Sequence, residues 1–297
     1  MEGRKNGGPE AFPARGDCLR AVPLTLRIEK LDHQAAAVRE RLLDFLAPHE
    51  AASLFITGNL RRDFPGSHLY AAARGAEWAG VAGYYAGPRS VAAFALDAEA
   101  TRALARHVAE QHPAIDYFNA VASVAEPGCE ALRPLGYEVA NDPRQVLMQL
   151  DAAPAPQPHE EKARPIAPAD HQAVARLLRY LENRSQEPPV TAEELVKVGT
   201  NPTRHVLVAD GRIASTASTN GIGISAFQIL GVATEPEHRR RGYARAVCAS
   251  LIRAMRGQGA RQTVLFTGRG NAAAQRCYQG LGFRPTGEFW VAKLSRG

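Results

Sequence analysis

The feature that most constrains this chain is a strand, a basic loop and a helix that follow one another near its C-terminal end. The apolar run Phe227–Val232 is short and rich in β-branched residues, which predicts a buried strand. Pro236 stops the strand, and Arg239–Arg241 and Gly242 lead into a helical pattern over Ala244–Met255. This order places backbone N–H groups, the positive end of a helix dipole and guanidinium groups in one small volume. Such a volume favours a phosphate or diphosphate ligand.

Two interpretations of the arginine run stay open on its composition alone. Consecutive arginines are typical of a solvated surface or of a general nucleic-acid patch. A glycine at the start of the helix instead favours a defined anion site, because a Cβ at Gly242 would hold the ligand away from the backbone.

Two blocks of sequence resemble the GNAT superfamily of N-acetyltransferases. Arg239–Ala244 matches the family pattern Q/R-x-x-G-x-G/A, and Asn271–Phe283 is similar to N-x-x-A-x-x-x-Y-x-x-x-G-F. One helix and one strand fit between the blocks, as in that family. The resemblance implies that the loop amides hold the diphosphate of acetyl-coenzyme A, and that the preceding strand lends backbone groups to the pantetheine arm. The coenzyme-binding residues that it implies are Val232, Ala233, Thr234, Arg239, Arg240, Arg241, Gly242, Tyr243, Ala244, Asn271, Ala274 and Tyr278.

The same resemblance implies a catalytic residue, Tyr278, which would protonate the leaving thiolate as a general acid. A phenol with an ordinary pKa of about 10 is protonated at neutral pH and can donate. The alternative is a half-buried packing tyrosine on an amphipathic helix. We expect Asn271 to be a helix N-cap that also contacts the pantetheine, and Gly282 and Phe283 to be a helix C-cap and a core residue.

No general base can be assigned. Many family members place a glutamate on the strand before the phosphate loop, where this chain has Gln228. Glu235, Glu288 and Glu182 are alternatives, and so are a chain of waters or an amine whose pKa is already low.

The 297 residues are sufficient for two domains of ordinary size. We predict a disordered lead-in at 1–22, a GNAT-like domain at 23–150, a proline-rich linker at 151–163 and the coenzyme-binding GNAT domain at 164–297. The fold class is α/β (α+β), with a mixed, mostly antiparallel sheet flanked by helices in each domain. The first domain repeats the element order of the second but has no arginine run and no glycine before its helix at 98, so we expect a degenerate copy. Its expected role is substrate selection or structural support.

Some element boundaries are specific expectations. The patterns predict a strand at Leu24–Ile28, a strand at Tyr117–Val124 and a helix at Pro127–Leu135 in the first half. In the second half, Asp170 and Thr191 are expected to cap the first two helices, and Asp210 and Gly211 to form a tight hairpin turn.

Composition limits the partners. The net charge of +6 suits a phosphate-bearing coenzyme, but the arginines are dispersed and no nucleic-acid-binding motif appears, so no nucleic-acid partner is expected. The cysteines, Cys18, Cys129, Cys248 and Cys277, have no metal-ligand spacing, which predicts no metal, buried free thiols and a reducing, cytoplasmic setting. We expect no secretory signal and no membrane-spanning segment, because the N-terminus lacks an apolar core and no apolar run reaches membrane-spanning length.

We therefore expect an acetyl-CoA-dependent N-acetyltransferase that acts on a primary amine of a small molecule or peptide, as a monomer or homodimer. The alternative function is a non-catalytic acyl-CoA sensor or regulatory module.

Overall fold

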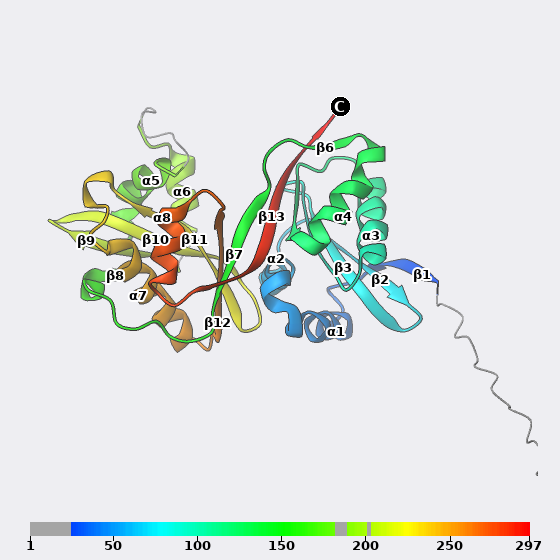
Figure 1. Cartoon of the computed structure of the whole chain (residues 1–297), viewed down its shortest axis with the longest axis horizontal. Coiled ribbons are helices and arrows are strands. Elements are labelled where there is room, and N and C mark those ends of the chain that lie inside the picture. The colour runs from blue at the N-terminus through cyan, green and yellow to red at the C-terminus, as the bar shows by residue number, and fades with distance from the viewer. Residues whose placement is uncertain (1–24, 182–188, 201–202) are drawn as a thin grey trace, which may run out of the picture.

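The strands of this protein join in one continuous sheet that runs through both halves of the chain (Figure 1). The computed structural model describes residues 25–181, 189–200 and 203–297. The predicted lead-in at 1–22 and the candidate base Glu182 lie outside the described residues. Within the described residues no helix is both long enough and apolar enough to cross a membrane.

The first half has strands and helices in alternation. Its elements are β1 (Leu26–Leu31), α1 (Ala36–Leu46), α2 (Glu50–Arg61), β2 (Ser67–Arg74), β3 (Glu77–Tyr85), β4 (Ser90–Ala95), α3 (Ala98–Gln111), β5 (Tyr117–Val121), α4 (Ala122–Leu132), β6 (Tyr137–Val139) and β7 (Arg144–Leu150).

The second half repeats this order, as the sequence predicted, except that it has no counterpart of β6 among the described residues. Its elements are β8 (Ala163–Pro165), α5 (His171–Arg179), α6 (Ala192–Gly199), β9 (His205–Ala209), β10 (Arg212–Ile222), β11 (Ala226–Thr234), α7 (Tyr243–Gly257), β12 (Gln262–Gly268), α8 (Ala272–Gln279) and β13 (Arg284–Arg296).

Helices cover both faces of the sheet in each half. In the first half, apolar side chains of α3 and α4 pack on one face and those of α1 and α2 on the other. In the second half, α7 and α8 cover one face and α5 and α6 the other. The mixed sheet with flanking helices confirms the predicted fold class.

The final strands of the two halves are exchanged. The strand order is β1-β2-β3-β4-β5-β13-β7-β12-β11-β10-β9-β8, so β13 pairs with β5 of the first half and β7 pairs with β12 of the second. The two exchanged strands also pair with each other at the centre of the sheet. The sheet therefore crosses the boundary between the predicted domains 23–150 and 164–297. That each range is an independent domain stays a prediction.

The segment predicted as a linker, 151–163, lies against the second half. Asp151 pairs with Arg284 (3.2 Å) and Glu160 pairs with Arg253 (2.5 Å). Its last residue, Ala163, is the first of β8. The segment is rich in proline and alanine, and two ion pairs of its charged residues attach it to α7 and β13.

Three sequence expectations for the first half need correction. The strand at Leu24–Ile28 covers Leu26–Leu31 instead, and the sequence did not predict β6. The strand at Tyr117–Val124 ends at Val121, because the next residues begin α4. The helix expected from Pro127 therefore starts earlier and contains this proline, and the burial of Val124, Cys129 and Leu132 offsets the backbone hydrogen bond that a proline cannot donate.

The caps of the first two helices in the second half differ from one another. Thr191 caps α6 as predicted, since its side chain accepts from the N–H of Glu194. Asp170 does not cap α5 with its side chain. Its carboxylate accepts from the Ala167 N–H (2.7 Å) and pairs with Arg164 (2.6 Å), so it stabilises the turn before the helix.

The start of α2 fastens the two halves together. The buried carboxylate of Glu50 accepts hydrogen bonds from the Ser225 N–H (2.9 Å), the Ser225 hydroxyl (2.9 Å) and the Ala226 N–H (3.0 Å) in the turn between β10 and β11. At the other end of the helix, Arg61 donates to the Ile224 carbonyl (3.2 Å) in the same turn. A carboxylate of the first half thus stabilises the turn that begins β11.

We predict that Glu50→Ala lowers the free energy of unfolding by about 2 kcal/mol, because two buried N–H donors lose a charged acceptor. Urea denaturation followed by circular dichroism measures this change. The matched control is Glu40→Ala, at an exposed position of α1, which should alter stability by less than about 0.5 kcal/mol. Equal stability of the two variants would contradict the assignment.

Candidate functional site

The basic loop and the start of α7 form a site for an anion. Gly242 is the N-cap of α7 and has φ +84°, a conformation that residues with a Cβ adopt at a cost. The helix's first backbone hydrogen bond runs from the Ala246 N–H to the Gly242 carbonyl (3.0 Å). The N–H groups of Tyr243, Ala244 and Arg245 precede this bond, so they are the orphan donors that a helix N-terminus presents to an anion.

A cavity of about 670 Å³ opens at this loop. Every residue that the sequence implied for coenzyme binding lines the cavity, except Arg241. The predicted residues that line it are Val232, Ala233, Thr234, Arg239, Arg240, Gly242, Tyr243, Ala244, Asn271, Ala274 and Tyr278. The role of Arg241 stays a prediction, and its exposed side chain lies outside the lining.

The charge of this cavity is positive. Four guanidinium groups line it, those of Arg239, Arg240, Arg245 and Arg276, and no carboxylate of the described residues does so. Sequence reasoning missed Arg245 and Arg276. A signal for Arg245 was present, because an arginine in the first turn of a helix opposes the helix dipole and is favoured there only beside an anion.

Helix α8 holds the second block of predicted residues. The Asn271 side chain accepts from the Ala274 N–H (3.1 Å), so this asparagine is the predicted N-cap. At the other end, Gly282 (φ +95°) donates to the Gln279 carbonyl (2.9 Å) and Phe283 donates to the Tyr278 carbonyl (3.1 Å). These two bonds make a Schellman C-cap. Both caps confirm the structural part of the prediction, and they fix the last turn of α8, which carries Tyr278.

Tyr278 is buried, with 9% of its surface exposed, and it lines the cavity. Burial raises the pKa of its phenol, and the thiols of Cys248 and Cys277 raise it further. The phenol is therefore neutral and able to donate a proton across the whole physiological pH range. Burial also raises the pKa of the Cys277 thiol to about 11, so this neighbour is uncharged as well.

The raised pKa of Tyr278 predicts a pH dependence of stability. The folded state holds the phenol proton more tightly than the unfolded chain, so this stabilisation is complete below about pH 10 and is lost as the pH rises further. We expect the free energy of unfolding of the unmodified protein to fall between about pH 9 and pH 11. The corresponding fall in the Tyr278→Phe variant should be smaller by about 1 kcal/mol, because this variant has no phenol to ionise. Urea denaturation at both pH values tests this, and parallel losses in the two proteins would contradict it.

A second cavity of about 360 Å³ meets the first at Val232 and Tyr278. The two cavities exist because β11 leaves β12: the strands pair in parallel only from Ala226 to Gln228. Both halves of the chain contribute to the lining. Its residues are Phe55, Asn119, Gln145, Asn220, Gln228, Ile229, Leu230, Gly231, Val232, Leu265, Phe266, Tyr278 and Val291.

The structure places Gln228 in this second cavity, at the position where many members of the family have a glutamate, and the amide of Gln228 cannot act as a base. Gln228 is buried, and its carbonyl accepts from the Asn220 amide (3.2 Å). Of the alternatives, Glu288 pairs with Arg269 (3.6 Å), and neither Glu288 nor Glu235 lines the two cavities. No carboxylate of the described residues therefore stands beside Tyr278 as a base.

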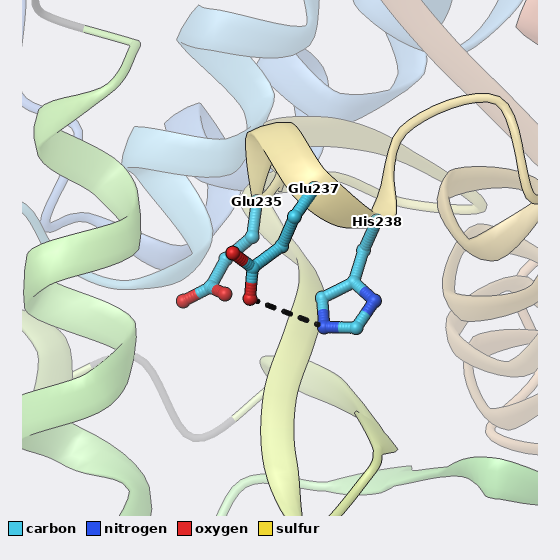
Figure 2. A group of neighbouring side chains, drawn as sticks. All are labelled: Glu235, Glu237 and His238. Carbon is cyan, nitrogen blue, oxygen red and sulfur yellow. Dashed lines mark ion pairs between the residues drawn. The ribbon is translucent and has the colours of Figure 1, made fainter.

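A group that could ligate a metal lies next to the basic loop. Figure 2 shows Glu235, Glu237 and His238 side by side in the turn after β11, and their ligand atoms lie within 4.8 Å of one another. Glu237 lies 3.3 Å from Arg212 and 3.8 Å from His238. The carboxylate of Glu237 is thus engaged in an ion pair with Arg212, whereas a bound cation would need this carboxylate as a ligand. That the protein uses no metal stays a prediction.

The first half has a different group at the corresponding helix start. Asp97 caps α3 by accepting from the Ala100 N–H (2.8 Å), and it pairs with Arg74 (2.7 Å). The hydrogen bond from Arg74 lowers the pKa of the Asp97 carboxyl. The protein's own anion thus satisfies the helix N-terminus that corresponds to the start of α7.

Comparison with known families agrees with this geometry. Residues 171–283 match the model of the acetyltransferase (GNAT) family, so the chain carries a GNAT acetyltransferase domain.

Curated relatives cover a smaller part of the chain. N-acetyltransferase family 8 member 3 from Mus musculus is 36% identical over 70 residues, which are 24% of this chain and 31% of that protein. N-acetyltransferase 8 from Homo sapiens is 34% identical over the same share. The chain thus matches less than a third of the length of these relatives.

Solved structures resemble the whole two-halved fold. A tandem GNAT protein from the clavulanic acid biosynthesis pathway is 16% identical with a TM-score of 0.55, covering 92% of this chain and 98% of that one. A GCN5-related N-acetyltransferase from Sphaerobacter thermophilus is 17% identical with a TM-score of 0.54, covering 84% and 93%. At these identities the likeness concerns the fold, which in both halves is that of a GNAT domain.

Proposed function

We propose that this protein is an N-acetyltransferase that transfers the acetyl group of acetyl-CoA to a primary amine of a small molecule or peptide. One observation carries the proposal: a positive cavity with orphan helix amides is lined by a buried phenol, and the same tyrosine also lines a second cavity. The first cavity fits a long, phosphate-bearing thioester, and the second fits the acceptor.

Each part of the first cavity has a task in this reaction. The amides that follow Gly242 and the guanidinium groups of Arg239, Arg240, Arg245 and Arg276 bind the diphosphate. Strand β12 does not pair with Val232–Thr234, so the backbone groups of these residues are available to bind the pantetheine arm. The thioester carbonyl then lies near Tyr278, at the junction of the two cavities.

In the reaction a nucleophile attacks the thioester, the C–S bond breaks and the sulfur receives one proton. The amine nitrogen bonds to the acetyl carbon as the C–S bond breaks, and the Tyr278 hydroxyl protonates the leaving thiolate. The proton released by the nitrogen passes through water to restore the phenol. Holding both reactants in line supplies a further part of the rate acceleration.

We propose that the first half binds no coenzyme and serves acceptor selection. Asp97 would repel a diphosphate at the start of α3, where α7 has Gly242. We also propose a cytoplasmic monomer or homodimer without a nucleic-acid partner.

The second candidate function is an acyl-CoA sensor. The absence of a carboxylate from the described lining of both cavities favours it, because a carboxylate there would be the group that deprotonates an ammonium. Release of free thiol in the presence of amines distinguishes an enzyme from a sensor.

Calorimetric titration with acetyl-CoA tests the site. Arg240→Ala removes a charge-assisted hydrogen bond and should raise Kd about tenfold, and Gly242→Asp should raise it further because it adds both a negative charge and a strained φ. The matched control is Arg261→Ala, which removes the same charge at an exposed position outside both cavities. Absence of saturable binding, or equal loss in Arg240→Ala and Arg261→Ala, would overturn the site.

Steady-state kinetics of Tyr278→Phe test the proton donor. We expect kcat to fall by about 100-fold, the usual range for loss of a general acid, while the Kd of acetyl-CoA changes by less than about twofold. A packing role alone would leave kcat almost unchanged, since phenylalanine keeps the ring.

A further inference from the structure

The second cavity is free of charge. Of the described side chains that line it, Tyr278 is the only titratable one. The other polar side chains of the lining carry amides, among them Asn119, Gln145 and Gln228. A protonated amine that entered this cavity would lose its hydration without gaining a carboxylate partner. That loss costs several kcal/mol, so the cavity selects against the ammonium form.

Aromatic rings form one side of the cavity. Phe55 from α2 and Phe266 from β12 line it, with ring centroids 5.8 Å apart. Phe289 stacks on Phe266 at 4.4 Å and supports that ring from β13. Rings held in this way favour a flat, apolar body that packs against them.

The side-chain amides of the cavity can form hydrogen bonds with polar groups of a flat, apolar ligand. The Asn119 side chain donates to the Ser90 hydroxyl (2.8 Å), which fixes the amide in place. The Gln228 carbonyl accepts from Asn220, which leaves the Gln228 NH₂ group as the donor end of that side chain. Neutral donors and acceptors of this kind bind hydroxyl, carbonyl or amide groups and give no preference for charge.

We propose that the acceptor is a weakly basic amine carried on an aromatic ring, of the arylamine class, which enters the second cavity already neutral. This inference rests on the proposed acetyl transfer. It removes the need for a general base, because a nitrogen that is uncharged at pH 7 can attack at once. The C–N bond forms, the C–S bond breaks, Tyr278 protonates the sulfur, and the proton lost by the nitrogen returns to the phenol through water.

The first half contributes to this selectivity. Phe55, Asn119 and Gln145 come from α2, β5 and β7, and the exchange of final strands brings β7 beside β12 and β13 beside β5. The degenerate half therefore supplies three of the residues that line the acceptor cavity, although its helix start at Asp97 has no diphosphate loop.

A panel of matched acceptors tests the inference with the full chain and acetyl-CoA, using thiol release as the readout. Each arylamine is paired with the alkylamine of the same size, for example aniline with cyclohexylamine. We expect kcat/KM for the arylamines to exceed that for the alkylamines by at least about tenfold at pH 7. The arylamine rate should be flat from about pH 6.5 to pH 9, whereas an alkylamine rate should rise with pH as its neutral fraction grows.

A variant of Gln228 provides a second readout. Gln228→Glu places a carboxylate beside the acceptor nitrogen, so the ratio of alkylamine to arylamine kcat/KM should rise by at least about tenfold. The matched control, Gln279→Glu, adds the same charge at an exposed position of α8 outside both cavities and should leave the ratio unchanged.

The outcomes separate this inference from the proposed function. Acetylation of alkylamines in preference to arylamines by the unmodified protein would overturn the acceptor class and leave acetyl transfer standing. Saturable binding of acetyl-CoA with no thiol release for any amine would overturn both and support the sensor.

Discussion

The divergence of β11 from β12 is the constraint on which the rest of this structure depends. The two strands pair from Ala226 to Gln228 and then separate, which leaves later backbone groups of β11 without partners on that side. An unpaired strand inside a sheet is stable only if something else satisfies its backbone. Both cavities lie along this opening, and Val232 and Tyr278 belong to both of them. The carboxylate of Glu50 matters for the same reason, since it stabilises the turn from which β11 starts.

The exchange of final strands makes the two halves one functional unit. Because β13 lies beside β5 and β7 beside β12, neither half has a complete sheet without the other. The second cavity is formed across this exchange, with Phe55 from one half and Phe266 from the other in ring contact. The first half, in which Asp97 caps the corresponding helix, therefore still contributes to a cavity of the second half.

Two helix N-termini illustrate how a duplicated site changes its role. The start of α3 is satisfied by Asp97, which also pairs with Arg74, so the positive end of the helix meets an internal anion. The start of α7 has Gly242 and a set of arginines instead, and its amides and charges face a cavity. A helix dipole and orphan N–H groups act equally in both places. The side chain at the N-cap decides whether the anion is internal or a ligand.

Local structure was determined by the sequence, because caps, turns and periodicity act over a few residues. Thr191, Asn271 and Gly282 took the capping roles expected of them, and nearly all the residues implied for coenzyme binding line one cavity. The early start of α4 at Ala122, the position of Arg241 outside the lining and the contributions of Arg245 and Arg276 were not predicted. Only the tertiary structure decided the exchange of β7 and β13 and the uncharged cavity around Gln228. The physical reason is that these features depend on pairing between strands far apart in the chain, and such pairing leaves no periodic signal in either strand alone.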